Sequence, residues 1–407
     1  MSAPAVPVPR HLVPLLAAFT SLVVLTTDVY LPVLPQLGTE LGTTSAAAAA
    51  TVSAVLVGIA VGQVVVGPLS DAVGRRVPLL VGGLAYAVAH LLSALAPSIG
   101  VLLGLRVLAG LATAACLVVT RAVVADAYPG AAAARAFATL SAVTAIAPVV
   151  APVAGGLLAH VMTWRGMFVV LAGAAVLLTA ISWRALPETL PAERRVPPHL
   201  GSVVAGLGSV LRIRTFLAYL AATAAFGGIL FGYIGASSFV LQGSFGLSPQ
   251  QYSLVFALNA VGIFVASNLS RHLVGRAGSA RLLASGHLTS GAGAVVLGVG
   301  VGLHSLPLVM AGLFLAVASL GLVIPAATTL GMAAAPGRAG AASGVLGICQ
   351  FTVGAIASPL AGAGGSPWSL VVVVAVCAAA GPVLLHVLRR PAPEPTAPHP
   401  SDTRSTT

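Results

Sequence analysis

The chain has 407 residues, of which 58% are hydrophobic and only 7% are charged. A soluble protein carries about 25% charged residues, so this chain cannot cover a water-facing surface of its own size, and a soluble enzyme is excluded. At about 20 apolar residues per crossing, its hydrophobic content is sufficient for roughly a dozen membrane helices. The composition therefore predicts an all-α protein that crosses the lipid bilayer many times.

All 19 basic residues are arginine. Without a lysine, the chain lacks the phosphate-binding residue of a P-loop and cannot form a Schiff base, so we expect no bound nucleotide. The three cysteines, Cys116, Cys349 and Cys377, stand singly in apolar runs without a CxxC pair. They predict neither a disulfide framework nor a metal site, and we expect no metal and no cofactor.

Twelve apolar stretches follow one another along the chain. Their approximate bounds are 12–34, 46–69, 78–96, 99–124, 136–159, 166–186, 216–241, 251–271, 280–301, 306–330, 340–362 and 368–388. This pattern predicts a six-helix half at 1–186, a central cytoplasmic loop at 187–214, a second six-helix half at 215–390 and a disordered cytoplasmic tail at 391–407. Leu-Ser-Asp at 69–71 recurs as Leu-Ser-Arg at 269–271, and each copy is followed by Gly-Arg, as expected for two pseudo-repeats.

The arginines predict how the chain is oriented. If both termini are cytoplasmic, the inner loops and chain ends hold every arginine except Arg165, in an outer loop, and Arg106, within a span. The reverse orientation would place almost all of them outside, against the positive-inside rule. We therefore expect a multi-pass cell-membrane protein with both termini in the cytoplasm. The formal charge of +11 is then explained by the arginines of the cytoplasmic loops, which orient the chain in the membrane. No nucleic-acid partner is expected.

A short segment at 67–76, Gly-Pro-Leu-Ser-Asp-Ala-Val-Gly-Arg-Arg, lies between the second and third predicted spans. Glycine and proline permit a tight turn, while the acid and the arginines can pair with neighbouring helix ends. A plain positive-inside signal would explain the arginines but neither the glycines nor the aspartate. The candidate gating residues of this segment are Gly67, Asp71, Gly74, Arg75 and Arg76.

The segment 67–76 resembles motif A of the major facilitator superfamily, with alanine at position 72 where a basic residue is usual. This resemblance implies the major facilitator fold, with two six-helix halves. It also implies that Asp71 docks on the start of the eleventh span and that Arg75 pairs with Asp126. These contacts would lock the two halves together while the site faces outward.

Asp28 lies within the first predicted span, in Thr-Thr-Asp-Val-Tyr-Leu-Pro at 26–32. A carboxylate at bilayer depth costs about 2.5–3.5 kcal/mol on insertion scales, and such groups commonly mark transport sites. Because burial disfavours the ionised form of a carboxylate, we expect Asp28 to bind and release protons. The alternative is that Asp28 lies near the outer end of the span, where it caps a helix or faces water.

Arg106 is the one arginine that falls inside a predicted span and not in a loop or at a chain end. Asp28 is the only acid predicted at a comparable depth in the membrane. A purely structural ion pair between them is one explanation. The Arg-x-x-x-Gly spacing at 106–110 resembles motif B of the superfamily, with alanine at position 109 where glutamine is common. The resemblance implies instead that Arg106 tunes the protonation of Asp28.

The fifth predicted span contains Ala-Pro-Val-Val-Ala-Pro-Val-Ala-Gly-Gly at 147–156. Two prolines four residues apart remove helix hydrogen bonds, and the glycines allow close packing of another span. A plain helix kink is the alternative. The segment resembles motif C, associated with antiporters, with alanine at position 151 in place of the usual glycine. Its candidate residues are Pro148, Pro152, Gly155 and Gly156.

Four segments together resemble the Bcr/CflA drug-exporter family, which includes bicyclomycin and chloramphenicol/florfenicol exporters. They are Asp-Val-Tyr-Leu-Pro-Val-Leu-Pro at 28–35, the motif C segment, Trp-Arg-Gly-Met-Phe at 164–168 and Glu-Thr-Leu-Pro-Ala-Glu-Arg-Arg at 188–195. The resemblance covers the first half and the central loop, while the second half matches mainly in its pattern of spans.

In that family, spans one, four, seven and ten line the cavity, so the resemblance implies that Tyr30, Thr113, Phe231 and Tyr233 contact the substrate. Other polar groups lie within the spans, and they are expected to serve as interhelical hydrogen-bond partners more often than as ligand contacts. They are Gln63, His90, Asn259, Asn268, His287 and Gln350.

These observations predict a monomeric, proton-coupled antiporter that exports a hydrophobic antibiotic, phenicol-like or bicyclomycin-like, by alternating access. The partners expected are the drug, protons and the lipid bilayer. One alternative is a transporter of a small metabolite such as an amino acid or a sugar, although sugar sites usually need more polar side chains than these spans offer. A second alternative is a membrane protein that does not transport.

Overall fold

The computed structural model describes residues 11–128, 130–196 and 200–389. All regular secondary structure in this part of the chain is helical, and twelve helical segments are long and apolar enough to cross a membrane. The predicted all-α fold with twelve spans is therefore confirmed. The predicted tail at 391–407 lies outside the described residues.

The first seven α-helices build the first bundle. They are α1 (Leu12–Asp28), α2 (Leu34–Glu40), α3 (Ser45–Val73), α4 (Arg76–Ala94), α5 (Ile99–Ala127), α6 (Gly130–Leu158) and α7 (Trp164–Ala185). After α8 (Leu200–Leu211), seven more form the second bundle. They are α9 (Arg214–Ser238), α10 (Pro249–Ala277), α11 (Ser279–Gly302), α12 (Leu306–Ala318), α13 (Leu320–Ala334), α14 (Ala339–Ala361) and α15 (Pro367–Arg389).

Small residues bring the helices of each bundle close together. Gly58 of α3 faces Gly110 of α5, and a side chain at either position would collide with the backbone of the other helix. Gly293 of α11 and Gly312 of α12 allow the same close approach in the second bundle. Because lipid provides no hydrophobic drive for helix association, such close backbone packing is what holds the spans together.

Three of the spans are interrupted. The first runs from Leu12 to Glu40, but α1 ends at Asp28 and the chain continues through a turn and the 3-10 helix η1 (Leu31–Val33) into α2. Pro32 lacks an N–H and disfavours helical geometry in the residue before it, which explains the break. The tenth span divides between α12 and α13, and the seventh continues from α9 into the π-helical turn η3 (Phe239–Ser244). The sequence predicted continuous helices here.

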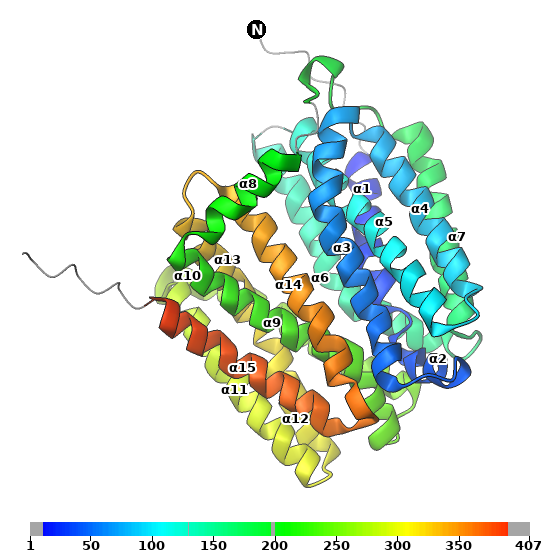
Figure 1. Ribbon diagram of the computed structural model, residues 1–407, viewed down its shortest axis with the longest axis vertical. Coiled ribbons are helices and arrows are strands. Elements are labelled where there is room, and N and C mark those ends of the chain that lie inside the picture. The colour runs from blue at the N-terminus through cyan, green and yellow to red at the C-terminus, as the bar shows by residue number, and fades with distance from the viewer. Residues whose placement is uncertain (1–10, 129, 197–199, 390–407) are drawn as a thin grey trace, which may run out of the picture.

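The two bundles meet most tightly at the end of the molecule where α2 lies, opposite the end that carries α8 (Figure 1). Four hydrogen bonds join them near this α2 end. In each, a side chain of one bundle donates to a backbone carbonyl of the other: Ser45 to Gly362, Ser358 to Ala49, Gln242 to Pro32 and Gln250 to Gly156.

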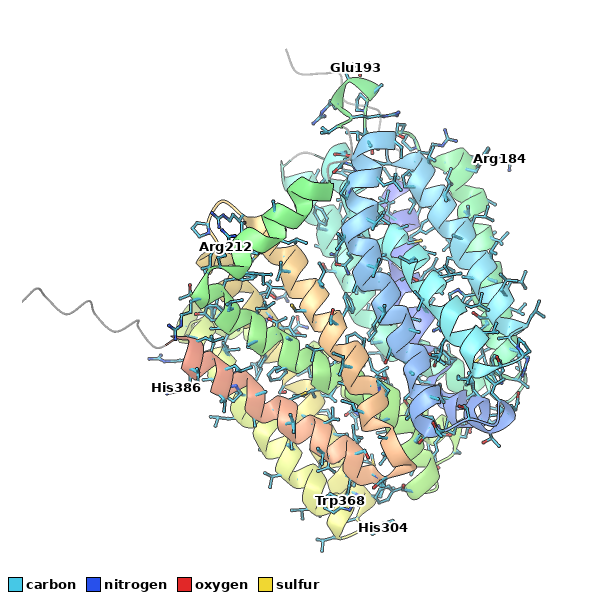
Figure 2. All side chains as sticks on the ribbon, viewed as in Figure 1. Arg184, Glu193, Arg212, His304, Trp368 and His386 are labelled. Atoms are coloured by element: carbon cyan, nitrogen blue, oxygen red, sulfur yellow. The ribbon has the colours of Figure 1, made fainter. Side chains whose placement is uncertain are left out.

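Charged side chains concentrate at the α8 end. Arg184, Glu193 and Arg212 lie there, whereas His304 and Trp368 lie at the opposite end (Figure 2). Between the ends, large apolar side chains point outward, as in the row Val57, Val61 and Val65 on α3. Such a surface suits the hydrocarbon interior of a bilayer. Arg121, which the sequence placed in a loop, lies instead within α5.

Candidate functional site

A cavity of about 350 Å³ lies between the two bundles. Its walls come from α1, α3 and α6 on one side and from α9, α10, α12, α13 and α14 on the other. Most of the lining is aliphatic or aromatic. Among the described residues that line it, Asp28 is the only one that carries a charge.

Asp28 is the last residue of α1 and is 4% exposed. It lies near the middle of the Leu12–Glu40 span, so the alternative that placed it at the outer end does not hold. The hydroxyl of Thr27 donates a hydrogen bond of 2.7 Å to its Oδ1. A carboxylate at the C-terminus of a helix faces the negative end of the helix dipole, which adds to the cost of its charge.

Arg106 lies behind α1 and does not reach the cavity. Its side chain is fully buried, one guanidinium nitrogen donates to the carbonyl oxygen of Thr26, and the other lies 3.3 Å from Nε2 of His90. The guanidinium also packs on the rings of Tyr30 and Phe168, at 4.7 and 5.0 Å from their centroids. Within the described part of the chain no ion pair joins Arg106 to Asp28, so the ion-pair alternative is wrong for this structure.

Two of the four predicted substrate contacts line the cavity and two do not. Phe231 and Tyr233 of α9 are part of the wall. Tyr30 is fully buried in the first bundle, where its hydroxyl lies 3.0 Å from that of Thr51. Thr113 is also fully buried, and its hydroxyl donates to the carbonyl of Ala109 at 2.7 Å. The expectation for Tyr30 fails because the turn after Asp28 takes this residue out of the helical register of α1.

The cavity also has polar wall groups that the family pattern did not indicate. The mostly apolar wall also contains the hydrogen-bonding side chains of Thr27, Thr144 and Gln350. Tyr233 accepts a hydrogen bond of 2.8 Å from Asn259 Nδ2, so Asn259 serves as an interhelical partner, as predicted. A site of this kind can hold an apolar molecule and orient it with a few hydrogen bonds.

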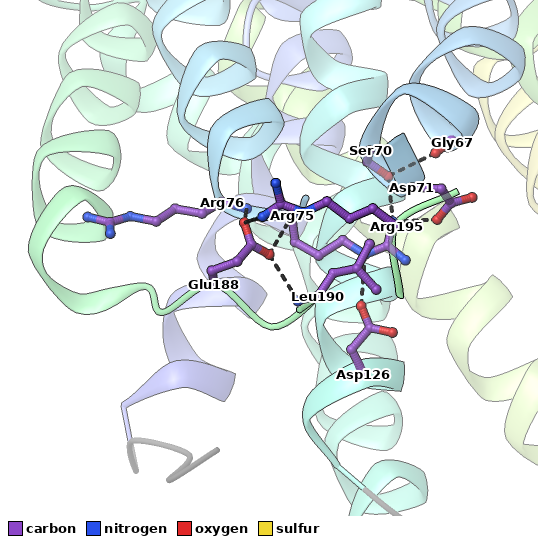
Figure 3. Close-up of polar contacts among 9 residues, drawn as sticks. All are labelled: Gly67, Ser70, Asp71, Arg75, Arg76, Asp126, Glu188, Leu190 and Arg195. Atoms are coloured by element: carbon purple, nitrogen blue, oxygen red, sulfur yellow. Dashed lines mark hydrogen bonds and ion pairs between the residues drawn. The ribbon is translucent and has the colours of Figure 1, made fainter. Parts of the chain in front are cut away.

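The segment 67–76 lies at the α8 end, away from the cavity, and Arg75 is its centre. Arg75 Nε donates to Asp126 at 2.8 Å, and Nη1 donates to Asp71 at 2.6 Å and to Ser70 at 2.8 Å (Figure 3). Burial disfavours the charged guanidinium, but the hydrogen bonds and charges of Asp126 and Asp71 outweigh it and raise the pKa of Arg75 above its ordinary value.

The implied contact between Arg75 and Asp126 is therefore present. The implied docking of Asp71 on the eleventh span is not, because the Asp71 side chain is 52% exposed and its carboxylate bonds Arg75 within its own bundle. The halves approach each other closely at the opposite, α2 end, which leaves Asp71 without the neighbour that the resemblance implied.

Glu188, which the sequence analysis did not single out, holds this segment from the central loop. Its carboxylate accepts the backbone N–H groups of Arg75 at 2.8 Å and Arg76 at 3.2 Å, at the start of α4 (Figure 3). Gly74 has φ of +101°, and a side chain there would collide with the Glu188 carboxylate. Gly74 is thus required both by its backbone conformation and by the docking of Glu188. Free N–H groups at a helix start are the signal that could have found this contact.

The motif C glycines lie where α6 meets two other helices. A side chain at Gly155 would collide with the carbonyl of Val29, at the break after α1. A side chain at Gly156 would collide with Ser253 of α10, in the second bundle. Pro148 lines the cavity, and both it and Pro152 lie inside the continuous helix α6. The segment therefore connects the Asp28 region with the interface between the bundles, which a plain kink does not explain.

The motif at 164–168 anchors the α2 end of the first span. Trp164 Nε1 and Arg165 Nη1 both donate to the same Oε2 atom of Glu40, at 2.8 and 2.7 Å. The guanidinium of Arg165 lies 4.0 Å from the centroid of the Trp164 ring. This contact ties the start of α7 to the end of α2, so it fixes the half of the first span that follows Asp28.

In the described part of the chain, twelve helical segments long enough to cross a membrane and a cavity between two bundles form the architecture of an integral membrane transporter. The family model of the Major Facilitator Superfamily matches residues 16–359, and the chain belongs to this family. It is therefore a transporter and not an enzyme. It is 36% identical over 338 residues to the Bacillus subtilis MFS-type transporter YdgK, covering 82% of this chain and 84% of the relative.

Two further relatives carry names that refer to drugs. The chain is 35% identical over 286 residues to a chloramphenicol resistance protein of Pseudomonas aeruginosa, covering 70% of this chain and 67% of the relative. It is 29% identical over 257 residues to a bicyclomycin resistance protein homolog of Haemophilus influenzae, covering 63% and 64%.

Solved structures show the same fold. A bacterial homolog of the human lysosomal transporter Spinster matches with a TM-score of 0.77 at 17% identity, covering 96% of this chain and 98% of that one. A nucleoside transporter matches with a TM-score of 0.75 at 11% identity, covering 93% and 98%. The family model and the relatives confirm the predicted family, and the solved structures confirm the predicted fold.

Proposed function

We propose that this protein exports a hydrophobic antibiotic, phenicol-like or bicyclomycin-like, in exchange for protons. The observation that carries the proposal is the apolar cavity between the bundles with one charged residue, Asp28, in its wall. The drug resistance named in two relatives supports this substrate class. Transport of a sugar or an amino acid is disfavoured, because such a substrate needs more hydrogen-bonding side chains than this wall provides.

Asp28 is the proposed proton carrier. Its burial makes the charge costly, and its position in the wall lets a bound drug exclude the water that would otherwise solvate the carboxylate. Drug and proton then compete for one site, which is the requirement for exchange. At about 150 mV, one proton supplies roughly 3.5 kcal/mol, so one-to-one exchange of a neutral drug can sustain a concentration ratio of about 300-fold.

Both termini and the α8 end are proposed to be cytoplasmic. The arginines at this end support that orientation under the positive-inside rule. The bundles are hydrogen-bonded to each other at the α2 end, which supports our proposal that the site in this conformation is reached from the cytoplasm. Rocking of the bundles about the cavity would bring Asp71 onto α14 and open the other side.

The first test is drug susceptibility of cells that express the chain, with and without a protonophore. We expect raised resistance to chloramphenicol or bicyclomycin that the protonophore abolishes. Resistance that persists without a proton gradient would exclude proton coupling, and unchanged susceptibility to both drugs would exclude this substrate class.

The second test replaces the proposed proton carrier. Asp28→Asn keeps the size of the side chain and mimics its protonated state, and it should reach the membrane because it removes a costly buried charge. In reconstituted vesicles with an imposed pH gradient, this variant should bind drug and lose uphill export. Full uphill export by Asp28→Asn would show that another group carries the proton.

A further inference from the structure

Arg106 and His90 form a buried polar contact in the first bundle. Both side chains are fully buried. Arg106 Nη1 lies 3.3 Å from His90 Nε2, and His90 Nδ1 lies 2.9 Å from the carbonyl oxygen of Tyr86. The Tyr86 ring stacks on the imidazole at 4.0 Å between centroids. The buried cation thus has a histidine, rather than an acid, as its side-chain partner.

This geometry defines the proton on the imidazole. A carbonyl oxygen can only accept, so the contact with Tyr86 requires a hydrogen on Nδ1 of His90. In a neutral imidazole the other nitrogen then has a free lone pair, and Nε2 can accept from Arg106. A doubly protonated ring would point an N–H at the N–H of the guanidinium. The observed arrangement is therefore that of a neutral histidine acting as an acceptor.

The same contact determines where the guanidinium lies relative to the proposed proton carrier. Arg106 also donates to the carbonyl of Thr26, in the last turn of α1. The Thr26 side chain points into the first bundle, where it bonds the hydroxyl of Tyr86, whereas Asp28, two residues later, lines the cavity. The cation is thus held on the far side of α1 from the carboxylate.

We propose that His90 is a positioning residue for proton coupling, which holds Arg106 in place on Thr26 and away from Asp28. The inference rests on the proposed role of Asp28. The other titratable groups around these three residues are Tyr30 in the turn after α1, Tyr86 on α4, Cys116 on α5, Tyr233 on α9 and Tyr252 on α10. Near this contact α7 contributes the rings of Trp164 and Phe168, which do not titrate.

Loss of the acceptor has a defined consequence. A buried N–H group without a partner is destabilising, and Arg106 Nε already lacks a hydrogen bond. The guanidinium keeps its bond to the carbonyl of Thr26, two residues before Asp28, so we expect its other end, once released from His90, to move closer to the Asp28 carboxylate. A cation closer to the carboxylate stabilises its ionised form, and Asp28 then takes up its proton only at lower pH.

Two variants test the roles of the two imidazole nitrogens of His90 separately. The amide of His90→Gln reaches the position of Nε2 and can still accept from Arg106. The shorter amide of His90→Asn reaches the position of Nδ1, so it can donate to the Tyr86 carbonyl but offers Arg106 no acceptor. His287→Asn is the matched control, because His287 is 7% exposed in the second bundle and both of its ring nitrogens lack a hydrogen-bond partner.

The measurement is infrared difference spectroscopy of purified protein titrated with acid, without drug. The carboxylic acid band that is lost in Asp28→Asn reports the protonation of Asp28. We expect its midpoint to fall by about one pH unit or more in His90→Asn, and to stay near the wild-type value in His90→Gln and His287→Asn.

Three results would overturn the inference. An unchanged midpoint in His90→Asn would show that His90 does not position Arg106, and equal shifts in the Gln and Asn variants would point to a packing effect. The absence of a titrating Asp28 band in the wild type would exclude both this inference and the proton carrier. Because the readout contains no drug, it is independent of whether the protein exports antibiotics.

Discussion

The contact between Glu188 and the start of α4 leads to a quantitative prediction. Glu188 accepts three backbone N–H groups, those of Arg75, Arg76 and Leu190, at 2.8, 3.2 and 3.0 Å. Replacing Glu188 with alanine leaves all three without this acceptor. The contact should therefore be the main anchor of the central loop on the segment 67–76.

The expected magnitude follows from the number and exposure of these hydrogen bonds. Loss of a single helix cap costs about 0.5–2 kcal/mol. Glu188 carries a charge and serves three donors, but its side chain is 28% exposed and water compensates part of the loss. We therefore expect Glu188→Ala to lower the free energy of local opening by about 2 kcal/mol, which is roughly a 30-fold change in the opening equilibrium.

Hydrogen exchange measured by mass spectrometry provides the assay. In Glu188→Ala, the amides of Arg75, Arg76 and Leu190 should exchange about 30-fold faster than in the wild type, if opening is followed by rapid closing. Glu193→Ala is the control, because this side chain is exposed in the same loop. Equal exchange in the two variants would refute the anchoring role of Glu188.

Four other results are expected. Arg106→Ala should shift the pH profile of transport to more alkaline values, opposite in sign to His90→Asn, because removal of a cation disfavours ionised Asp28; an unchanged profile would contradict this. Gly155→Ala should cost about 1–3 kcal/mol of unfolding free energy, whereas Gly173→Ala, which meets no atom within 4 Å, should cost little. Arg75→Ala and Asp126→Ala should be non-additive for transport rate, with a coupling of about 0.5–3 kcal/mol, while drug affinity stays near wild type. A cysteine at Ala192, in a background without the native cysteines, should resist an impermeant thiol reagent on intact cells; rapid labelling would reverse the topology.

The positions of the spans were predictable because lipid imposes one dominant constraint. Each crossing must be apolar and helical over about 20 residues, and that requirement is visible in a single sequence. The contact between Arg75 and Asp126 was also predictable, but through resemblance, since 51 residues separate the pair in sequence. Asp28 was identifiable because a carboxylate inside a span is costly wherever the neighbouring helices lie.

The side-chain partners inside the spans were less predictable. Tyr30 and Thr113 were expected in the cavity, but α1 breaks after Asp28 and both side chains are buried within the first bundle. Helical periodicity cannot locate such a break in advance, because Pro32 is compatible with a kinked helix as well as with an interrupted one. Glu188 was seen only as part of a family motif, although its contact with α4 is local to the folded loop.

Sequence by itself determined where the twelve spans of the described chain lie, that Asp28 and Arg106 carry charge inside them, and which end gathers most of the arginines. These properties depend on the polarity of each residue relative to lipid and water. Tertiary structure decided that Arg106 contacts His90 and Thr26 instead of Asp28, and that Asp28 alone supplies charge to the described cavity wall. Those contacts depend on which faces of α1, α4 and α5 meet, and that is set by the packing of small residues between helices far apart in the sequence.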